Sequence, residues 1–403
     1  MNESHHDKAT VFERFPRLTI LALAGISFVL LDLMVTFVTQ VAGVAPQATP
    51  AADGEPDPNQ GYRQRSDIYH HDLLANVASD SANWGQLKYS VYTDSLGFKS
   101  DRVKSTPLLS ERYRILFIGD SFTEGIGYEY DETFVGRIAN ALSGEGIDVL
   151  NAGVSSYSPI IYWRKIKYLL EDVGLDVDEV IVFLDISDIQ DEAIIWRLAD
   201  DGTVIDIVGE QPVEQMQQKE GLKGLMKRRL MFSYFLLNEV HDLIFPASDY
   251  YVDQDRSLWT IDPKLMQAWG QDGLERAAAS MSKLAELLRS RGIPLTVAVY
   301  PWPDQVAKND LESIQASYWR DWAGQHGTGF LNYFPCFVTG DVREVLDNYY
   351  ILRDSHWNAA GHRLVADEFV STYRRALAER KQSAQRDSRN AINASLSVCD
   401  KAS

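Results

Sequence analysis

The chain has 403 residues, of which 45% are hydrophobic and 24% are charged, as is ordinary for a folded protein with a sizeable core. Its 57 acidic residues outnumber its 39 basic ones, which gives a net charge of −18. This balance excludes nucleic acid as an expected partner, because binding to a phosphate backbone relies on clustered lysine and arginine. Cys336 and Cys399 lack the spacing of a metal or redox motif, but they could form one disulfide in an oxidising compartment.

An apolar stretch near the N-terminus, residues 18–44, predicts one transmembrane helix. Basic residues precede it and none follows before Arg63. The positive-inside rule therefore places residues 1–17 in the cytoplasm and the rest of the chain outside it, in the periplasm. A cleaved signal peptide is the alternative, although the apolar region is long for one and Pro46 disrupts the small-residue cleavage site.

Asp32 interrupts this apolar stretch. Ionisable residues inside a membrane are costly and are functional hypotheses by default, so a contact to a membrane partner is one interpretation. The other is that Asp32 turns toward the nearer interface. Residues 45–60, rich in alanine, proline, aspartate and glycine, predict a flexible tether to a folded body over residues 61–380.

Two short motifs open this body. Tyr69-His70-His71-Asp72 contains metal-ligand residue types, but no further ligands follow at a fixed spacing, so we expect histidines at the surface or at the edge of a cleft. Residues 89–93 have the composition of a strand, and the turn signal in 94–97 follows them. They predict an edge hairpin ahead of the first strand of the main sheet.

From residue 113 the pattern alternates apolar strands with amphipathic helices. Strands are expected at 113–118, 147–150, 179–185, 295–300 and 329–333. Helices are expected at 134–142, 159–172, 264–291 and 310–325, with a last one that ends near residue 379. The strands are too continuously hydrophobic to have an exposed face, so this α/β alternation predicts a parallel sheet covered by helices on both faces.

Residues 195–260 break this rhythm. They contain a predicted hairpin around Asp201-Gly202 and an apolar helical stretch over 222–245, so we expect a mainly helical insertion. The insertion either covers a site as a lid or simply packs on the sheet. Residues 381–403 are polar and predict a loosely held C-terminal tail.

Gly119-Asp120-Ser121 ends the first strand and precedes a helix. A serine there lies beside free backbone N–H groups that can stabilise a developing negative charge, although helix capping is the alternative role. Far along the chain, Asp354 and His356 are two residues apart and can project to the same side. A carboxylate, an imidazole and a serine are the groups that activate a hydroxyl as a nucleophile.

These motifs together resemble the SGNH/GDSL hydrolases. The segment 119–125 resembles the family's first block, Asn151-Ala152-Gly153 resembles the second, and 354–356 with Gly361-His362 resembles the fifth. The resemblance implies a flavodoxin-like three-layer α/β/α domain and ester hydrolysis or acyl transfer with no metal and no cofactor. It assigns the nucleophile to Ser121, the base to His356 and the acid to Asp354.

The resemblance also implies an oxyanion hole made by the N–H groups of Ser121 and Gly153. The family's third block has an asparagine as a further donor, and here Ser187 stands in that place, with Gln190 as a second candidate. Further residues with an expected role in substrate contact or support are Asp120, Asn151 and Asp188.

The short Asp-x-His spacing and the membrane anchor are similar to the membrane-anchored polysaccharide O-acetylation branch, typified by alginate O-acetyltransferases. This implies a serine esterase or O-acyltransferase that acts on acyl esters of carbohydrate, with acetyl as the expected acyl group. The alternative is an inactive or weakly active scaffold of the same fold, which recruits a polysaccharide or a membrane acyltransferase.

Overall fold

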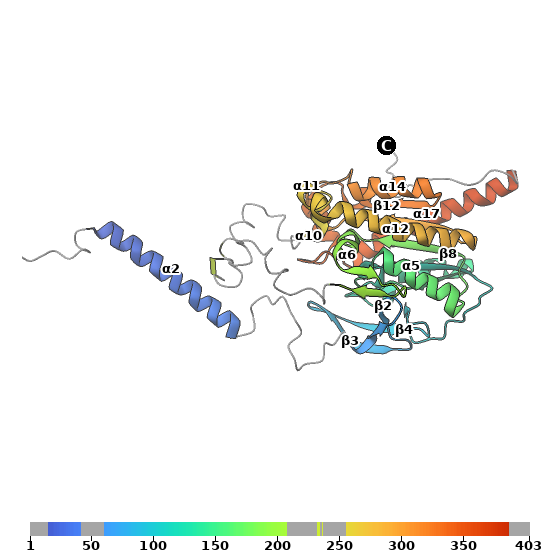
Figure 1. The fold of residues 1–403 in the computed structure, drawn as a ribbon, viewed down its shortest axis with the longest axis horizontal. Coiled ribbons are helices and arrows are strands. Elements are labelled where there is room, and N and C mark those ends of the chain that lie inside the picture. Colours follow the sequence, from blue (N-terminus) through green and yellow to red (C-terminus); the bar gives the residue numbers. More distant parts are fainter. Residues whose placement is uncertain (1–14, 42–59, 208–231, 234–235, 237–254, 387–403) are drawn as a thin grey trace, which may run out of the picture. The chain divides into compact units, whose positions relative to one another are not determined.

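The computed structural model describes residues 15–41, 60–207, 232–233, 236 and 255–386 (Figure 1). The chain forms two compact units. One contains Met1–Gly54 and Gln211–Pro246, and the other contains Glu55–Glu210 and Ala247–Ser403. Part of the expected 195–260 insertion therefore belongs to the unit of the N-terminal helix. The predicted tether, the C-terminal tail and the helical stretch over 222–245 lie almost wholly outside the described residues.

The larger unit is built on a five-stranded parallel sheet with the order β12-β11-β8-β6-β7. The strands are β6 (Tyr113–Gly119), β7 (Ile147–Asn151), β8 (Glu179–Leu184), β11 (Leu295–Val299) and β12 (Gly329–Asn332). Every residue of β8 and β11 is buried, as the continuous apolar runs predict. In chain order the sheet reads 5-4-3-1-2, which is the flavodoxin-like arrangement and confirms the predicted fold class.

Helices cover both faces of this sheet (Figure 1). On one face α12 (Gln271–Ser290) packs against α5 (Pro159–Tyr168) and α6 (Asp188–Ile194). On the other face α4 (Phe134–Leu142) packs against α17 (Ala359–Arg386). The last helix is longer than expected, since it continues to Arg386 instead of ending near residue 379.

The described part of the chain also forms three small antiparallel sheets. One of them pairs β1 (Arg63–Ser66) with β2 (His70–Leu73). Strands β9 (Trp196–Leu198) and β10 (Val204–Asp206) form the hairpin that was predicted around Asp201-Gly202. The predicted strand over 89–93 is β4 (Leu87–Thr93), but it does not add to the edge of the parallel sheet. It lies between β3 (Ala78–Trp84) and β5 (Lys99–Ser100) in a separate three-stranded sheet, so both of its edges are already paired.

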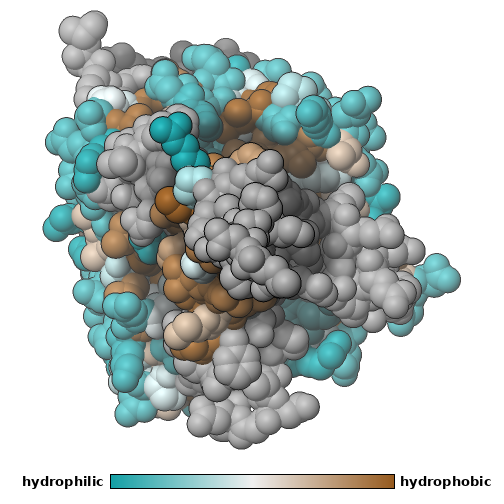
Figure 2. Space-filling model, turned by 90° about the vertical axis from the view of Figure 1, so that its left-hand side faces the viewer, coloured by the Kyte–Doolittle hydropathy of each residue, from teal (hydrophilic) through white to brown (hydrophobic). Residues whose placement is uncertain are grey.

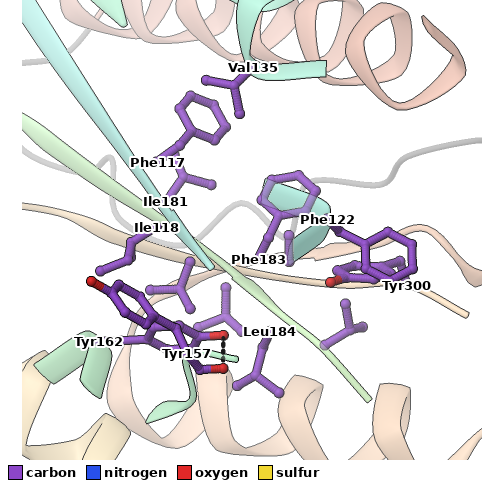
Figure 3. Close-up of a cluster of buried hydrophobic side chains, with 14 of the residues drawn as sticks. Phe117, Ile118, Phe122, Val135, Tyr157, Tyr162, Ile181, Phe183, Leu184 and Tyr300 are labelled. Atoms are coloured by element: carbon purple, nitrogen blue, oxygen red, sulfur yellow. Dashed lines mark hydrogen bonds between the residues drawn. The ribbon is translucent and has the colours of Figure 1, made fainter. Parts of the chain in front are cut away.

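The core beneath the carboxyl ends of the strands is strongly aromatic. Figure 3 shows Phe122 and Tyr300 side by side, and their ring centroids are 4.9 Å apart. Phe117 and Phe183 project from the adjacent strands β6 and β8, and both are fully buried. These rigid rings leave little freedom to the turn that follows β6, and that turn carries the predicted nucleophile.

The smaller unit contains α2 (Pro16–Val41), which agrees with the predicted span over residues 18–44 within a few residues. Its length and composition suit a membrane crossing, and a signal sequence near an N-terminus has the same character. Most of its large apolar side chains are exposed, including Leu21 and Met34. On the face of the molecule in Figure 2, hydrophobic side chains gather in brown patches among the hydrophilic ones.

Candidate active site

Ser121 lies on the turn between β6 and the short helix α3 (Ser121–Glu124). Asp120 caps this helix, because its Oδ1 accepts a hydrogen bond from the Phe122 N–H over 3.0 Å. A side chain at Gly119 would come within 2.7 Å of the Phe183 carbonyl oxygen, so the close approach of β6 to β8 requires glycine there. The turn therefore presents the half-buried Ser121 hydroxyl at the carboxyl edge of the sheet.

A chain of hydrogen bonds joins Ser121 to the distant Asp354-Ser355-His356 loop. Ser121 Oγ lies 2.8 Å from His356 Nε2, and His356 Nδ1 lies 2.5 Å from Asp354 Oδ1. Asp354 Oδ1 also accepts the His356 backbone N–H, so the carboxylate holds both the backbone and the ring of the histidine. The structure thus brings together the three residues to which the sequence assigned catalysis.

Trp84 completes this group, although no motif in the sequence indicated it. Its Nε1–H donates to Asp354 Oδ2 over 2.7 Å, and its ring lies nearly perpendicular to the His356 ring at 5.1 Å. Burial favours the neutral form of Asp354, but hydrogen bonds and charge from His356 outweigh it, so the pKa of Asp354 lies below its ordinary value. Asp354 therefore carries a negative charge that can stabilise an imidazolium.

The expected oxyanion donors differ in availability. The Ser121 N–H, at the start of α3, has no acceptor in the described part of the chain. The Gly153 N–H already donates to Asn151 Oδ1 over 3.0 Å. Ser187 is buried at the start of α6, where its N–H donates to Asp185 Oδ1, and Gln190 is partly exposed on the same helix.

Asn151 has a structural role that the resemblance did not specify. Its Nδ2 donates to the Thr123 carbonyl oxygen over 2.8 Å, which ties the end of β7 to α3. A side chain at Gly153 would come within 2.7 Å of Thr123, so the second motif packs directly against the nucleophile helix. Glu124 continues this connection, because it accepts hydrogen bonds from Arg63 and from the Ser155 N–H, each over 2.6 Å.

Three buried carboxyl groups, the aspartate cluster of Asp120, Asp185 and Asp188, lie on the other side of Ser121. Their oxygens are within 4.8 Å of one another, which makes them the one metal-ligand grouping found in the described part of the chain. Hydrogen bonds from Tyr162 to Asp188 and from Trp302 to Asp185, each 2.7 Å, satisfy part of the cluster. Burial and mutual repulsion raise the pKa of Asp120 and of Asp188 well above the ordinary value, so bound protons lower the charge of the group.

The aspartate cluster also touches the nucleophile. Ser121 Oγ lies 3.0 Å from Asp120 Oδ2, as well as 2.8 Å from His356 Nε2. One hydroxyl proton therefore has two neighbouring acceptors. A protonated Asp120 would donate to Ser121 Oγ and leave the serine proton to the imidazole.

A pocket of about 520 Å³ opens beside this site. Trp84 connects the two, because it lines the pocket and contacts both His356 and Asp354. The pocket wall combines aromatic rings with hydrogen-bonding groups. Its lining residues are Tyr62, Arg63, His70, His71, Trp84, Tyr89, Ile126, Ser155, Ser156, Asp191, Ile195, Trp196 and Arg256.

The His70-His71 pair, expected at the surface or at a cleft edge, lines this pocket. His71 Nε2 lies 2.8 Å from the Ser155 carbonyl oxygen, and burial lowers the pKa of His71 to about 4, so the ring is neutral near pH 7. Asp72, in the same motif, is buried in an ion pair of 2.7 Å with Lys165. Arg256 donates to both carboxylate oxygens of Asp191 over 2.8 Å at the opposite wall.

Cys336 takes part in a disulfide. Cys399, its predicted partner, lies outside the described residues.

No protein-family model and no curated protein matches the chain. Among solved structures it is similar to TesA at 12% identity and a TM-score of 0.36, over 64% of this chain and 96% of TesA. It is also similar to the psychrotrophic esterase EstA from Pseudoalteromonas sp., at 12% identity and a TM-score of 0.33, over 66% and 98% of the two chains. A third similar structure is a variant of the acetylxylan esterase Axe2 from Geobacillus stearothermophilus, at 13% identity and a TM-score of 0.36. The similarity covers 66% of this chain and 95% of the Axe2 chain. Similarity this distant is no basis for assigning a reaction.

Proposed function

We propose that this protein is a membrane-anchored serine esterase or O-acyltransferase that acts on acyl esters of carbohydrate. The observation that carries the proposal is the hydrogen-bonded chain from Ser121 through His356 to Asp354. Ser121 meets His356 and Asp354, more than 200 positions further along the chain, in the geometry that activates a hydroxyl. The proposal includes a membrane span in α2, with the larger unit on the extracytoplasmic side.

The reaction follows from the orientation of His356. Asp354 holds the Nδ1–H tautomer, so the Nε2 lone pair faces the Ser121 hydroxyl and takes its proton as Oγ attacks the ester carbonyl carbon. The Ser121 N–H stabilises the oxyanion, and the imidazolium then gives its proton to the departing alcohol oxygen. His356 next removes a proton from water or from a sugar hydroxyl, whose oxygen attacks the acyl carbon. The bond between the acyl carbon and Ser121 Oγ then breaks, His356 returns the proton to Oγ, and a free acid or a new ester is released.

The pocket beside Trp84 supports a carbohydrate as the alcohol component. Trp84, Trp196 and Tyr89 offer flat apolar faces to the C–H faces of a sugar ring. Arg256, Asp191 and Ser155 offer donors and acceptors for hydroxyl groups within the same cavity. This combination of stacking surfaces and convergent polar groups suits a saccharide better than it suits a long acyl chain.

Hydrolysis of p-nitrophenyl acetate by the full-length protein in detergent tests the nucleophile. Ser121→Ala should lower kcat/KM by about 10³-fold or more, while Ser290→Ala, at an exposed position on α12, should leave it unchanged. Equal rates for wild type and Ser121→Ala would overturn the assignment. Mass spectrometry of the products after addition of an acetyl-free oligosaccharide distinguishes hydrolysis from acyl transfer. Transfer yields an acetylated sugar, whereas hydrolysis yields acetate alone.

The hydrogen bond that occupies the Gly153 N–H favours one rival, a scaffold that keeps the fold without efficient catalysis. Such a protein would bind a polysaccharide or recruit a membrane acyltransferase. A fluorophosphonate probe discriminates between the two, since it forms a covalent bond only with an activated serine. Labelling of wild type but not of Ser121→Ala supports the enzyme, and no labelling of a folded wild type supports the scaffold.

A further inference from the structure

Two polar residues of the helix α2 are buried, whereas most of its large apolar residues are exposed. Asp32 and Thr36, one turn apart, are 2% and 8% exposed, whereas Leu30 and Met34 are 61% and 64% exposed. A helix on the surface of a soluble protein has the opposite pattern, with its apolar stripe buried. The outward face of α2 is therefore suited to lipid, and its inward face is suited to protein.

Two residues far along the chain cover this inward face. Asp32 Oδ1 accepts the backbone N–H groups of Phe232 and Ser233 over 2.9 and 3.2 Å, and the Ser233 hydroxyl donates to Asp32 Oδ2. The rings of Phe28 and Phe232 meet edge to face, with centroids 5.5 Å apart. These contacts lie within one compact unit, which unites the N-terminal segment with residues 211–246.

The position of Asp32 along α2 sets the depth of this contact. Asp32 lies four residues before Thr36, the last residue of the apolar span Pro16–Thr36, which corresponds to about 6 Å along the axis at 1.5 Å per residue. The hydrocarbon layer is about 30 Å thick, so a spanning α2 holds Asp32 below the headgroups. An unpaired carboxylate there is costly, and the three hydrogen bonds from Phe232 and Ser233 offset that cost.

We propose that Phe232 and Ser233 enter the bilayer beside α2 and bind Asp32 there, so that the chain contacts the membrane through a second segment. The sequence agrees with this placement. Lys227-Arg228-Arg229, suited to anionic headgroups, is followed by the apolar run Leu230-Met231-Phe232 and, after Ser233, by Tyr234-Phe235-Leu236-Leu237. The inference rests on the proposed span of α2 and is independent of the esterase reaction.

Cysteine accessibility in intact membranes tests this proposal with the full-length protein. Ser233→Cys should react with a charged, membrane-impermeant maleimide about tenfold or more slowly than Ser290→Cys, an exposed position on α12, when both faces of the membrane are open to reagent. Detergent solubilisation should remove most of this difference. Equal labelling of both positions in membranes would overturn the proposal.

A second pair of variants tests the role of Asp32. Asp32→Leu makes α2 more apolar and keeps it in the membrane, but it removes the acceptor, so labelling of Ser233→Cys in this background should rise about tenfold. Asp32→Asn keeps one acceptor oxygen and should preserve most of the protection. If Asp32→Leu leaves the labelling rate unchanged, Asp32 does not hold this segment and the proposal fails. Activity toward p-nitrophenyl acetate is a separate readout, so failure here leaves the proposed reaction standing.

Discussion

Two sets of acidic side chains lie near Ser121, and their pKa values are shifted in opposite directions. Burial, reinforced by mutual repulsion, raises the pKa of Asp120 and of Asp188, whereas the hydrogen bonds and charge of His356 outweigh burial at Asp354. Asp354 faces one imidazole and one indole N–H, and its pKa lies below its ordinary value. Asp120 and Asp188 face each other and Asp185, and their pKa values lie well above the ordinary value. The environment thus favours the charged form of an aspartate on one side of the predicted nucleophile and the protonated form on the other.

The largest expected effect comes from removing the negative charge of Asp354. Asp354→Asn keeps the size of the side chain, but it cannot stabilise the imidazolium and it favours the wrong tautomer of His356. We expect kcat for p-nitrophenyl acetate to fall by about 10³–10⁴-fold, with little change in KM. Asp347→Asn, an exposed site on the helix before this loop, is the control. A loss of less than tenfold would show that Asp354 does not orient the base.

A further buried carboxyl group, outside the aspartate cluster, can be tested through stability. Glu192, on α6 with Asp188, has its pKa raised from 4.5 to about 7 by burial. The folded state keeps this proton where the unfolded state loses it, so the associated stability is complete below about pH 4.5 and is lost as the pH rises through about 7. Glu192→Gln should remove a decline of up to about 3 kcal/mol in the free energy of unfolding over this range.

Urea denaturation at a series of pH values measures that decline. Glu286→Gln, at an exposed position on α12, should keep the pH dependence of the wild type. An unchanged slope for Glu192→Gln would mean that Glu192 is ionised in the folded protein at neutral pH.

The smallest expected effect comes from removing the hydrogen bond that Trp84 donates to Asp354. Trp84→Phe keeps an aromatic ring beside His356 but removes the N–H that donates to Asp354 Oδ2. We expect kcat/KM to fall by about tenfold and the acidic limb of the pH profile to move upward, because Asp354 loses a bond that favours its charged form. Trp163→Phe, on α5, should change neither quantity. A Trp84→Phe enzyme with an unchanged profile would limit this tryptophan to lining the pocket.

The sequence was sufficient for the parallel sheet, because its strands are local apolar runs and their alternation with helices determines the layers. It failed for β4, whose local pattern identifies a strand but not its neighbours. Pairing depends on β3 and β5, and a strand with both edges occupied cannot extend the main sheet. Local periodicity carries no information about which edge is free.

The residues of the candidate site that stand in sequence motifs could be predicted. The residues that join it only through tertiary contacts could not. Ser121, Asp354 and His356 stand in short motifs whose residue types indicate a reaction. Trp84 reaches Asp354 from 270 positions away, and Phe232 and Ser233 reach Asp32 from about 200. The two aspartates were noticed in the sequence, but no pattern marked Trp84, Phe232 or Ser233 as their partners. Such pairs form only when the folded chain brings the partners together. In the sequence, the partner residues cannot be distinguished from residues that simply pack in the core.

In the proposed mechanism, the hydrogen bond between Gly153 and Asn151 would affect the timing of catalysis. Because the Gly153 N–H is bound to the Asn151 side chain, it can join the oxyanion hole only after that amide rotates away. The first attack then relies on one preset donor and a reorganisation that the substrate must drive. Activated aryl esters tolerate this arrangement, whereas an unactivated sugar ester depends on binding in the pocket to release the second donor. The resting geometry would thus select substrates by how well they bind and not by how easily they are cleaved.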